Sequence, residues 1–138
     1  MATNKEPIFL NTAITKNVEI DSAASTATFA VFTAGSDGGI VTNLSATTTD
    51  TSAVICVLTM NDGAQTNVIG EVSVAAGSGT DGSSPTVNIL DVNALKGLLQ
   101  ADGSLIVGAN AVLSVNAKSA VTAAKTLNVS MSGGSYSA

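Results

Sequence analysis

The sequence lacks histidine, arginine and tryptophan, and it carries few charges of either sign. Charged residues make up 11% of the 138 residues, against roughly 25% in an ordinary soluble domain. Without histidine, the chain cannot form a Ser-His-Asp or Cys-His catalytic site or a histidine-ligated metal centre. Without arginine, it cannot form a bidentate phosphate clamp. We therefore expect no enzymatic activity and no metal site.

The charge balance and the short apolar runs also restrict the partners. Five scattered lysines against ten acidic residues give a net charge of -5, and nucleic-acid binding relies on clustered positive charge. The longest apolar run is the six-residue stretch 53–58, whereas a membrane-spanning helix needs about 20 residues and a signal-peptide core about 7–15. We expect no nucleic-acid partner, no membrane association and no export signal.

Cys56 is the single cysteine, so the chain has no internal disulfide framework. It lies in the apolar run 53–58, which favours a small buried side chain. A reactive thiol is the alternative, but no basic neighbour in the sequence would lower the pKa of Cys56.

Period-two alternation of apolar and polar residues, with many β-branched side chains, predicts a succession of strands. The candidate strands are 25–32, 40–49, 53–61, 67–74, 111–117 and 127–131.

Four Asp-Gly pairs supply turns between these runs, and Asp62-Gly63 should close a hairpin. Asp91 could cap a helix of at most two turns over residues 92–99, where Val92, Leu95 and Leu99 have helical spacing. The expected fold is an all-β, antiparallel β-sandwich of jelly-roll type, with about eight strands and one short helix. Residues 1–24 should form an N-terminal arm and first strand, and residues 25–138 the sandwich.

Three motifs suggest chemistry but have simpler explanations. The stretch 77–82 resembles a phosphate loop but lacks the Gly-Lys-Ser/Thr ending, so we expect a mobile connection. The Asp-Gly pairs lack the spacing of calcium loops and are explained as turns. Glu19 and Asp21 could pair as catalytic carboxylates, but we expect a solvated strand edge, where like charges discourage unwanted strand pairing.

The low charge predicts a surface rich in Ser, Thr, Asn, Ala and Gly, which is typical of a protein whose faces are covered by partners. The polar terminal segments 1–4 and 132–138 should not order on their own, and we expect contacts with other chains to hold them.

Three stretches of the sequence resemble a known family in their order and spacing. They are 47–53, 69–90 and 120–129. The pattern is similar to that of small head decoration, or cement, proteins of tailed bacteriophages, and it extends over roughly residues 25–136.

This resemblance implies a β-sandwich subunit that assembles as a homotrimer on the outer surface of a phage head. It would be made in the host cytoplasm and bind the major capsid protein across capsomer junctions, without catalysis or a cofactor. The N-terminal arm, with Lys5, Pro7, Ile8, Phe9 and Leu10, is the candidate clamp on the capsid, because Pro7 keeps the chain extended and an apolar run follows it. Alternatively, residues 8–10 begin the first core strand.

Two other classes of function remain open. A carbohydrate-binding or adhesive sandwich of a tail fibre would need stacked aromatic rings, and the sequence has one Tyr and three Phe; glycan binding would support it. A hydrolase of unusual type would need a pair of carboxylates in a deep pocket.

Overall fold

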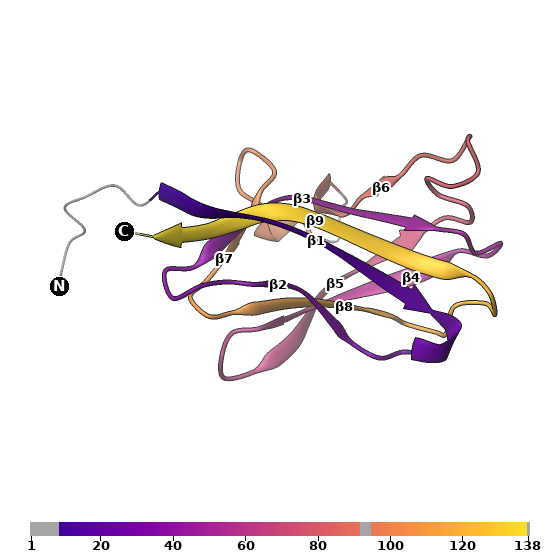
Figure 1. Cartoon of the computed structure of the whole chain (residues 1–138), viewed down its shortest axis with the longest axis horizontal. Coiled ribbons are helices and arrows are strands. Elements are labelled where there is room, and N and C mark those ends of the chain that lie inside the picture. Colours follow the sequence, from indigo (N-terminus) through magenta and orange to yellow (C-terminus); the bar gives the residue numbers. More distant parts are fainter. Residues whose placement is uncertain (1–8, 92–94, 138) are drawn as a thin grey trace.

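Two antiparallel sheets pack face to face in the computed structural model, which describes residues 9–91 and 95–137 (Figure 1). The described residues form nine strands: β1 (Phe9–Asp21), β2 (Phe29–Thr33), β3 (Gly39–Thr48), β4 (Val54–Asn61), β5 (Thr66–Val74), β6 (Val87–Asn88), β7 (Leu105–Val107), β8 (Val112–Ala117) and β9 (Thr126–Ser137). They also form three 3-10 turns: η1 (Ser22–Ala24), η2 (Ile89–Asp91) and η3 (Lys96–Leu98).

The strand order is that of a jelly roll. One sheet has the order β1-β9-β3-β6, with β7 also paired to β3, and the other has the order β2-β8-β4-β5. Each outgoing strand pairs antiparallel with a returning one: β1 with β9, β2 with β8, β3 with both β6 and β7, and β4 with β5. The chain therefore runs as one long hairpin rolled across both sheets, which confirms the expected fold class.

Alternation along the strands produces the core. In β4 the residues Val54, Cys56 and Leu58 are buried between the sheets, and the buried residues Ala117 and Val115 of β8 lie beside Cys56 and Leu58. Each fully buried Leu or Val contributes about 1.5–3 kcal/mol relative to an exposed one. Cys56 is completely buried, as expected, and burial raises the pKa of its thiol to about 12.

The predicted hairpin at Asp62-Gly63 is confirmed. Strands β4 and β5 pair antiparallel, and the N–H of Asp62 donates to the carbonyl of Gln65 at 3.1 Å. Gly63 has a φ of +100°, a conformation that glycine adopts without the strain imposed by a Cβ. The turn chemistry therefore fixes both the position and the register of this hairpin.

The C-terminal segment differs from the expectation that other chains must order it. Strand β9 continues to Ser137, and its residues 132–137 pair with β1 on one side, while residues 132–135 also pair with β3 on the other. The backbone hydrogen bonds of a sheet do not require apolar side chains. A polar, glycine-containing segment is thus ordered within its own chain.

The short helix expected over residues 92–99 has no α-helical counterpart among the residues that the structure describes. Residues 92–94 lie outside those residues, and η2 and η3 flank them as single 3-10 turns. Gly97 lies within η3, where glycine disfavours a helix, and Leu99 is already extended. Leu95 is nevertheless fully buried, so this connection covers part of the core.

Two glycines allow β9 and β3 to approach closely. A Cβ on Gly133 of β9 would overlap the carbonyl oxygen of Ile40, and a Cβ on Gly39 of β3 would lie 2.7 Å from the carbonyl oxygen of Gly134. The Cβ on Gly39 would also meet the ring of Phe32, a buried side chain of the other sheet, at 2.5 Å. These neighbours are backbone or buried side chain, so neither contact can be relieved by a flexible surface side chain. Only a residue without a side chain fits at either position.

We predict that Gly133→Ala destabilises the fold, because the new methyl group must displace the backbone of β3. Overpacking of this kind costs about 1–3 kcal/mol in the free energy of unfolding. Chemical denaturation measures the change. Gly108→Ala is the matched control, because a Cβ at Gly108 meets no atom within 4 Å; equal destabilisation of the two variants would contradict the close approach.

Candidate interaction surface

The structure describes two of the five residues predicted as a clamp. Lys5, Pro7 and Ile8 lie outside the described residues. Phe9 and Leu10 begin β1, where their backbones lie opposite Ser137 and Tyr136 of β9. The backbones of these two residues thus belong to the first strand, and both a clamp role for the arm and a core role for residues 8–10 stay predictions.

The outer face of the sheet formed by β1, β9 and β3 carries mainly small, uncharged polar side chains. Core-facing positions alternate with these outward ones, as Val18, Val129 and Leu44 illustrate by their burial. The outward Ser, Thr and Asn side chains, which we call the polar face, are Thr15, Asn17, Asn43, Ser45, Thr47, Asn128, Ser130 and Ser132. Ala13, Ile40 and Glu19 also face outward, at the margins of this set.

The register aligns the polar face into rows across three strands. Ser132 lies opposite Thr15 on one side and Asn43 on the other, and Ser130 likewise lies between Asn17 and Ser45. The side-chain amide of Asn43 donates to Oγ of Ser132 at 3.2 Å. Such cross-strand pairs stabilise a sheet by roughly 0.2–1 kcal/mol each.

Much of the hydrogen-bonding capacity of this face is not used by the residues that the structure describes. In the part of the chain that the structure describes, the side chains of Asn17, Ser45 and Ser130 make no hydrogen bond to protein atoms. Each hydroxyl both donates and accepts, and each amide does both as well. A partner can therefore satisfy these groups without the large desolvation cost of burying an unpaired ion.

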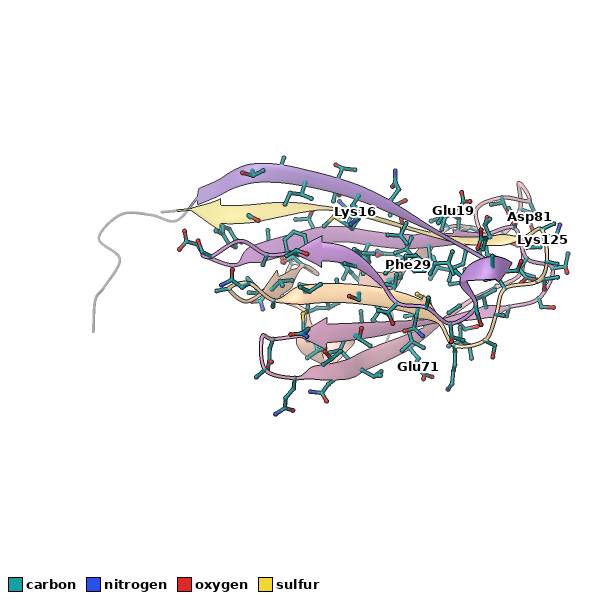
Figure 2. The ribbon with its side chains drawn as sticks, turned by 60° about the horizontal axis from the view of Figure 1, so that its bottom comes forward. Lys16, Glu19, Phe29, Glu71, Asp81 and Lys125 are labelled. Atoms are coloured by element: carbon teal, nitrogen blue, oxygen red, sulfur yellow. The ribbon has the colours of Figure 1, made fainter. Side chains whose placement is uncertain are left out.

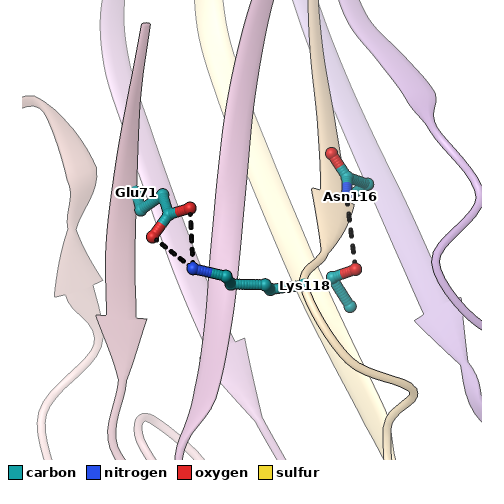
Figure 3. A network of polar contacts seen from close by, with 4 residues as sticks. Glu71, Asn116 and Lys118 are labelled. Carbon is teal, nitrogen blue, oxygen red and sulfur yellow. Dashed lines mark hydrogen bonds and ion pairs between the residues drawn. The ribbon is translucent and has the colours of Figure 1, made fainter. Parts of the chain in front are cut away.

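The outer face of the other sheet has a different chemistry. Lys118, just after β8, reaches across β4 to Glu71 of β5, with its Nζ 3.1 Å from the carboxylate (Figure 3). Ile55 and Val68 are exposed on β4 and β5, at 40% and 59%. Both partners of the ion pair are well exposed, so the pair contributes at most about 1 kcal/mol.

A buried carboxylate holds together the loops at one end of the sandwich. Asp50, which is 3% exposed, follows β3 and accepts hydrogen bonds from the N–H of Ser52 at 3.0 Å and the N–H of Thr122 at 2.9 Å. The hydroxyl of Thr122 donates to the same carboxylate at 2.8 Å. The N–H of Thr122 is the main cause that lowers the pKa of Asp50; burial opposes this effect, and the N–H of Ser52 adds to it.

The glycine-rich connection 75–86 is tied to the same loops, in contrast to the mobile connection that we expected. The hydroxyl of Thr80 donates to the carbonyl of Thr48 at 2.6 Å, and the N–H of Gly77 donates to the carbonyl of Asp50 at 3.0 Å. Ser78 is 1% exposed, and its backbone carbonyl accepts a hydrogen bond from the N–H of Thr48 at 3.0 Å. These bonds give the connection a fixed shape.

Two surface hollows flank Asp50. One of about 170 Å³ is lined by Ser52, Ile55, Lys118 and neighbouring residues, and one of about 430 Å³ is lined by Thr49, Thr51, Gly77, Thr80 and Asp81. Asp81 lies at this loop end with Lys125 (Figure 2).

The carboxylates beside these hollows are engaged in turns. The backbone N–H groups of Ser84 and Ser83 bind Asp81 and lower its pKa to about 2. Within the described ranges, no group of three or more His, Cys, Asp or Glu residues could hold a metal ion. The carboxylates of Asp50 and Asp81 therefore stabilise loops.

Glu19 and Asp21 are exposed at the end of β1, an edge strand, as the sequence predicted. Asp21 accepts from the N–H of Ala24 at 2.9 Å and so caps η1. The two residues bound the polar face at the loop end.

We predict that Asp50→Asn lowers the free energy of unfolding by about 2 kcal/mol at pH 7, since charge-assisted hydrogen bonds are lost. The folded-state pKa of Asp50 is lowered from its ordinary value of 3.8. The carboxylate therefore stabilises fully above that value, and the contribution disappears as the pH falls through the lowered pKa.

Urea unfolding at several pH values measures this difference, which should shrink below about pH 4. Asp37→Asn makes the same charge change on an exposed turn and is the matched control. A difference that does not change with pH would contradict the role of the Asp50 charge.

Comparisons with known proteins give no family assignment. No protein-family model matches the sequence, and a search of curated proteins found no match. In the described residues, no helix is long and apolar enough to cross a membrane. The similarity to phage decoration proteins therefore stays a prediction.

Proposed function

We propose that the chain is a non-enzymatic virion protein, a decoration or cement subunit that binds the outer surface of a phage head. It acts as a homotrimer that contacts the major capsid protein across capsomer junctions and stabilises them. The observation that carries the proposal is the polar face, an array of uncharged Ser, Thr and Asn side chains over three paired strands.

The polar face suits contact with a protein surface of varied shape. Its side chains are short, so little rotamer entropy is lost when they are fixed. Their donors and acceptors can pair with backbone groups of a neighbouring chain. Since no charge lies at the centre of the face, contact does not require an ion to be desolvated without a partner.

Simultaneous contact with several capsid subunits would make such a protein a cement. Once one contact is made, the next contacts are effectively intramolecular, and the total affinity far exceeds that of each contact alone. A net charge of -5 favours the outer surface of the head, because packaged DNA would repel an acidic subunit.

Virions of the phage that encodes the chain test the proposal. Mass spectrometry of purified virions should detect the chain, and heads that lack it should release DNA at a lower temperature and regain stability when the purified protein is added. Deletion heads that keep full thermal stability and bind no added protein would overturn the proposal.

The polar face can be tested separately with one charge. Ser130→Arg should weaken binding to deletion heads at least tenfold, because the arginine would be buried without a partner. Ser114→Arg is the matched control, since Ser114 lies on β8, an inner strand of the other sheet. Cosedimentation with heads measures binding, and light scattering checks that both variants keep three times the 13.5 kDa monomer mass. If Ser114→Arg weakened binding to the heads more than Ser130→Arg did, the contact would lie on the opposite sheet.

A further inference from the structure

The sheet edges differ in how far they can pair with another chain. At one edge, β3 is covered by the two-residue β6 and the three-residue β7. Edge strand β2 has five residues and a register shift, and edge strand β5 is also interrupted by a register shift, next to Leu58. Short strands and bulges are the usual means by which proteins block edge pairing.

Strand β1 lacks these protections over most of its length. It is the longest strand among the described residues, with 13 residues, and pairs with β9 alone. From Thr12 to Asp21 the register with β9 runs through ten residues without a shift, a length of about 33 Å. No other strand of the described residues pairs with its second edge, which therefore presents a regular row of N–H and C=O groups.

Charges on β1 narrow the choice of partner. Glu19 and Asp21 lie near its end, so the uncharged part of the edge extends from Thr12 to Val18 apart from Lys16 (Figure 2). Lys16 alternates with Ile14, Val18 and Ile20, and so it lies on the core-facing side of the strand although it is exposed.

Pairing with a second copy would bring two lysines together. If two copies paired antiparallel along the uncharged part of the edge, with Thr12 of one copy opposite Val18 of the other, Lys16 would lie opposite Ile14 of the other copy. The two Lys16 side chains would then be diagonal neighbours about 7–8 Å apart on the same side of the sheet, where like charges repel. A strand from a different chain can instead place a carboxylate opposite Lys16.

We infer that the free edge of β1 between Thr12 and Val18 accepts an extended strand of the capsid protein, with an acidic side chain facing Lys16. Backbone hydrogen bonds would supply affinity, and alternate side chains would supply specificity. The inference rests on the proposed function and names the contact by which the subunit attaches. The added strand would lie beside Thr15 and Asn17 and so extend the polar face.

Hydrogen exchange measured by mass spectrometry, on the free protein and on the protein bound to deletion heads, tests this inference. In the free protein, about half of the β1 amides should exchange fast, because only alternate residues donate to β9. Binding to heads should slow those amides at least tenfold, whereas the edge strand β5 should not change.

Each other outcome has a distinct meaning. No binding to heads would overturn both the proposed function and this inference. Binding without protection of β1 would overturn the inference alone. Protection of β1 already present in the free protein would show that a second copy occupies the edge, and it would also overturn the inference.

Charge reversal at Lys16 gives an independent measurement. Lys16→Glu should weaken binding to deletion heads at least tenfold, while Lys16→Arg should bind as the unaltered protein does. The unfolding midpoint of both variants should not change. Lys125→Glu, the same change of charge in the β8–β9 connection, is the matched control. Equal binding by Lys16→Glu and the unaltered protein would contradict the acidic partner.

Discussion

The pairing of the first strand with the last is the interaction on which the rest of this structure depends. Strand β9 lies between β1 and β3, so it joins residues from the start, the middle and the end of the chain in one sheet. Val18 and Ile20 are buried only while β1 is held in this place. Gly133 allows β3 to approach on the other side. Loss of this pairing would remove the core contacts of β1 and the polar face together.

The three stretches 47–53, 69–90 and 120–129 meet at one end of the sandwich. Asp50 belongs to the first stretch, Gly77 and Thr80 to the second, and Thr122 to the third, and hydrogen bonds join all three. The spacing of the three stretches therefore has a structural cause, because a buried carboxylate requires matched donors at fixed positions. The polar face, which we propose as the contact surface, has no comparable spacing requirement.

Local signals in the sequence were enough to predict some elements but not their partners. The alternation of apolar and polar residues predicted the positions of β3, β4, β5 and β8 closely, and Asp62-Gly63 predicted the hairpin between β4 and β5. Both signals act between neighbouring residues. The end of β9 was missed because residues 132–137 are polar and glycine-containing, and only pairing with β1 and β3 makes them a strand. The bond between Asp50 and Thr122 spans 72 positions, so no local pattern could reveal it. The composition predicted a surface rich in Ser, Thr and Asn. The position of the polar face on β1, β9 and β3 could be found only from the pairing register of these strands.

The polar face and the free edge of β1 meet on the same strand, and this geometry limits how a partner could use both. Thr15 and Asn17 direct their side chains to the polar face, while the backbone of the same residues forms the free edge. A strand added at that edge would therefore enlarge the polar face without covering it. The face would stay available to a second capsid subunit. On the proposed function, one subunit could then hold two neighbours through two different kinds of contact, backbone pairing at the edge and side-chain hydrogen bonds on the face. Because the two contacts share a rigid sheet, binding at one would position the other, which is the condition for a cement that acts across a junction.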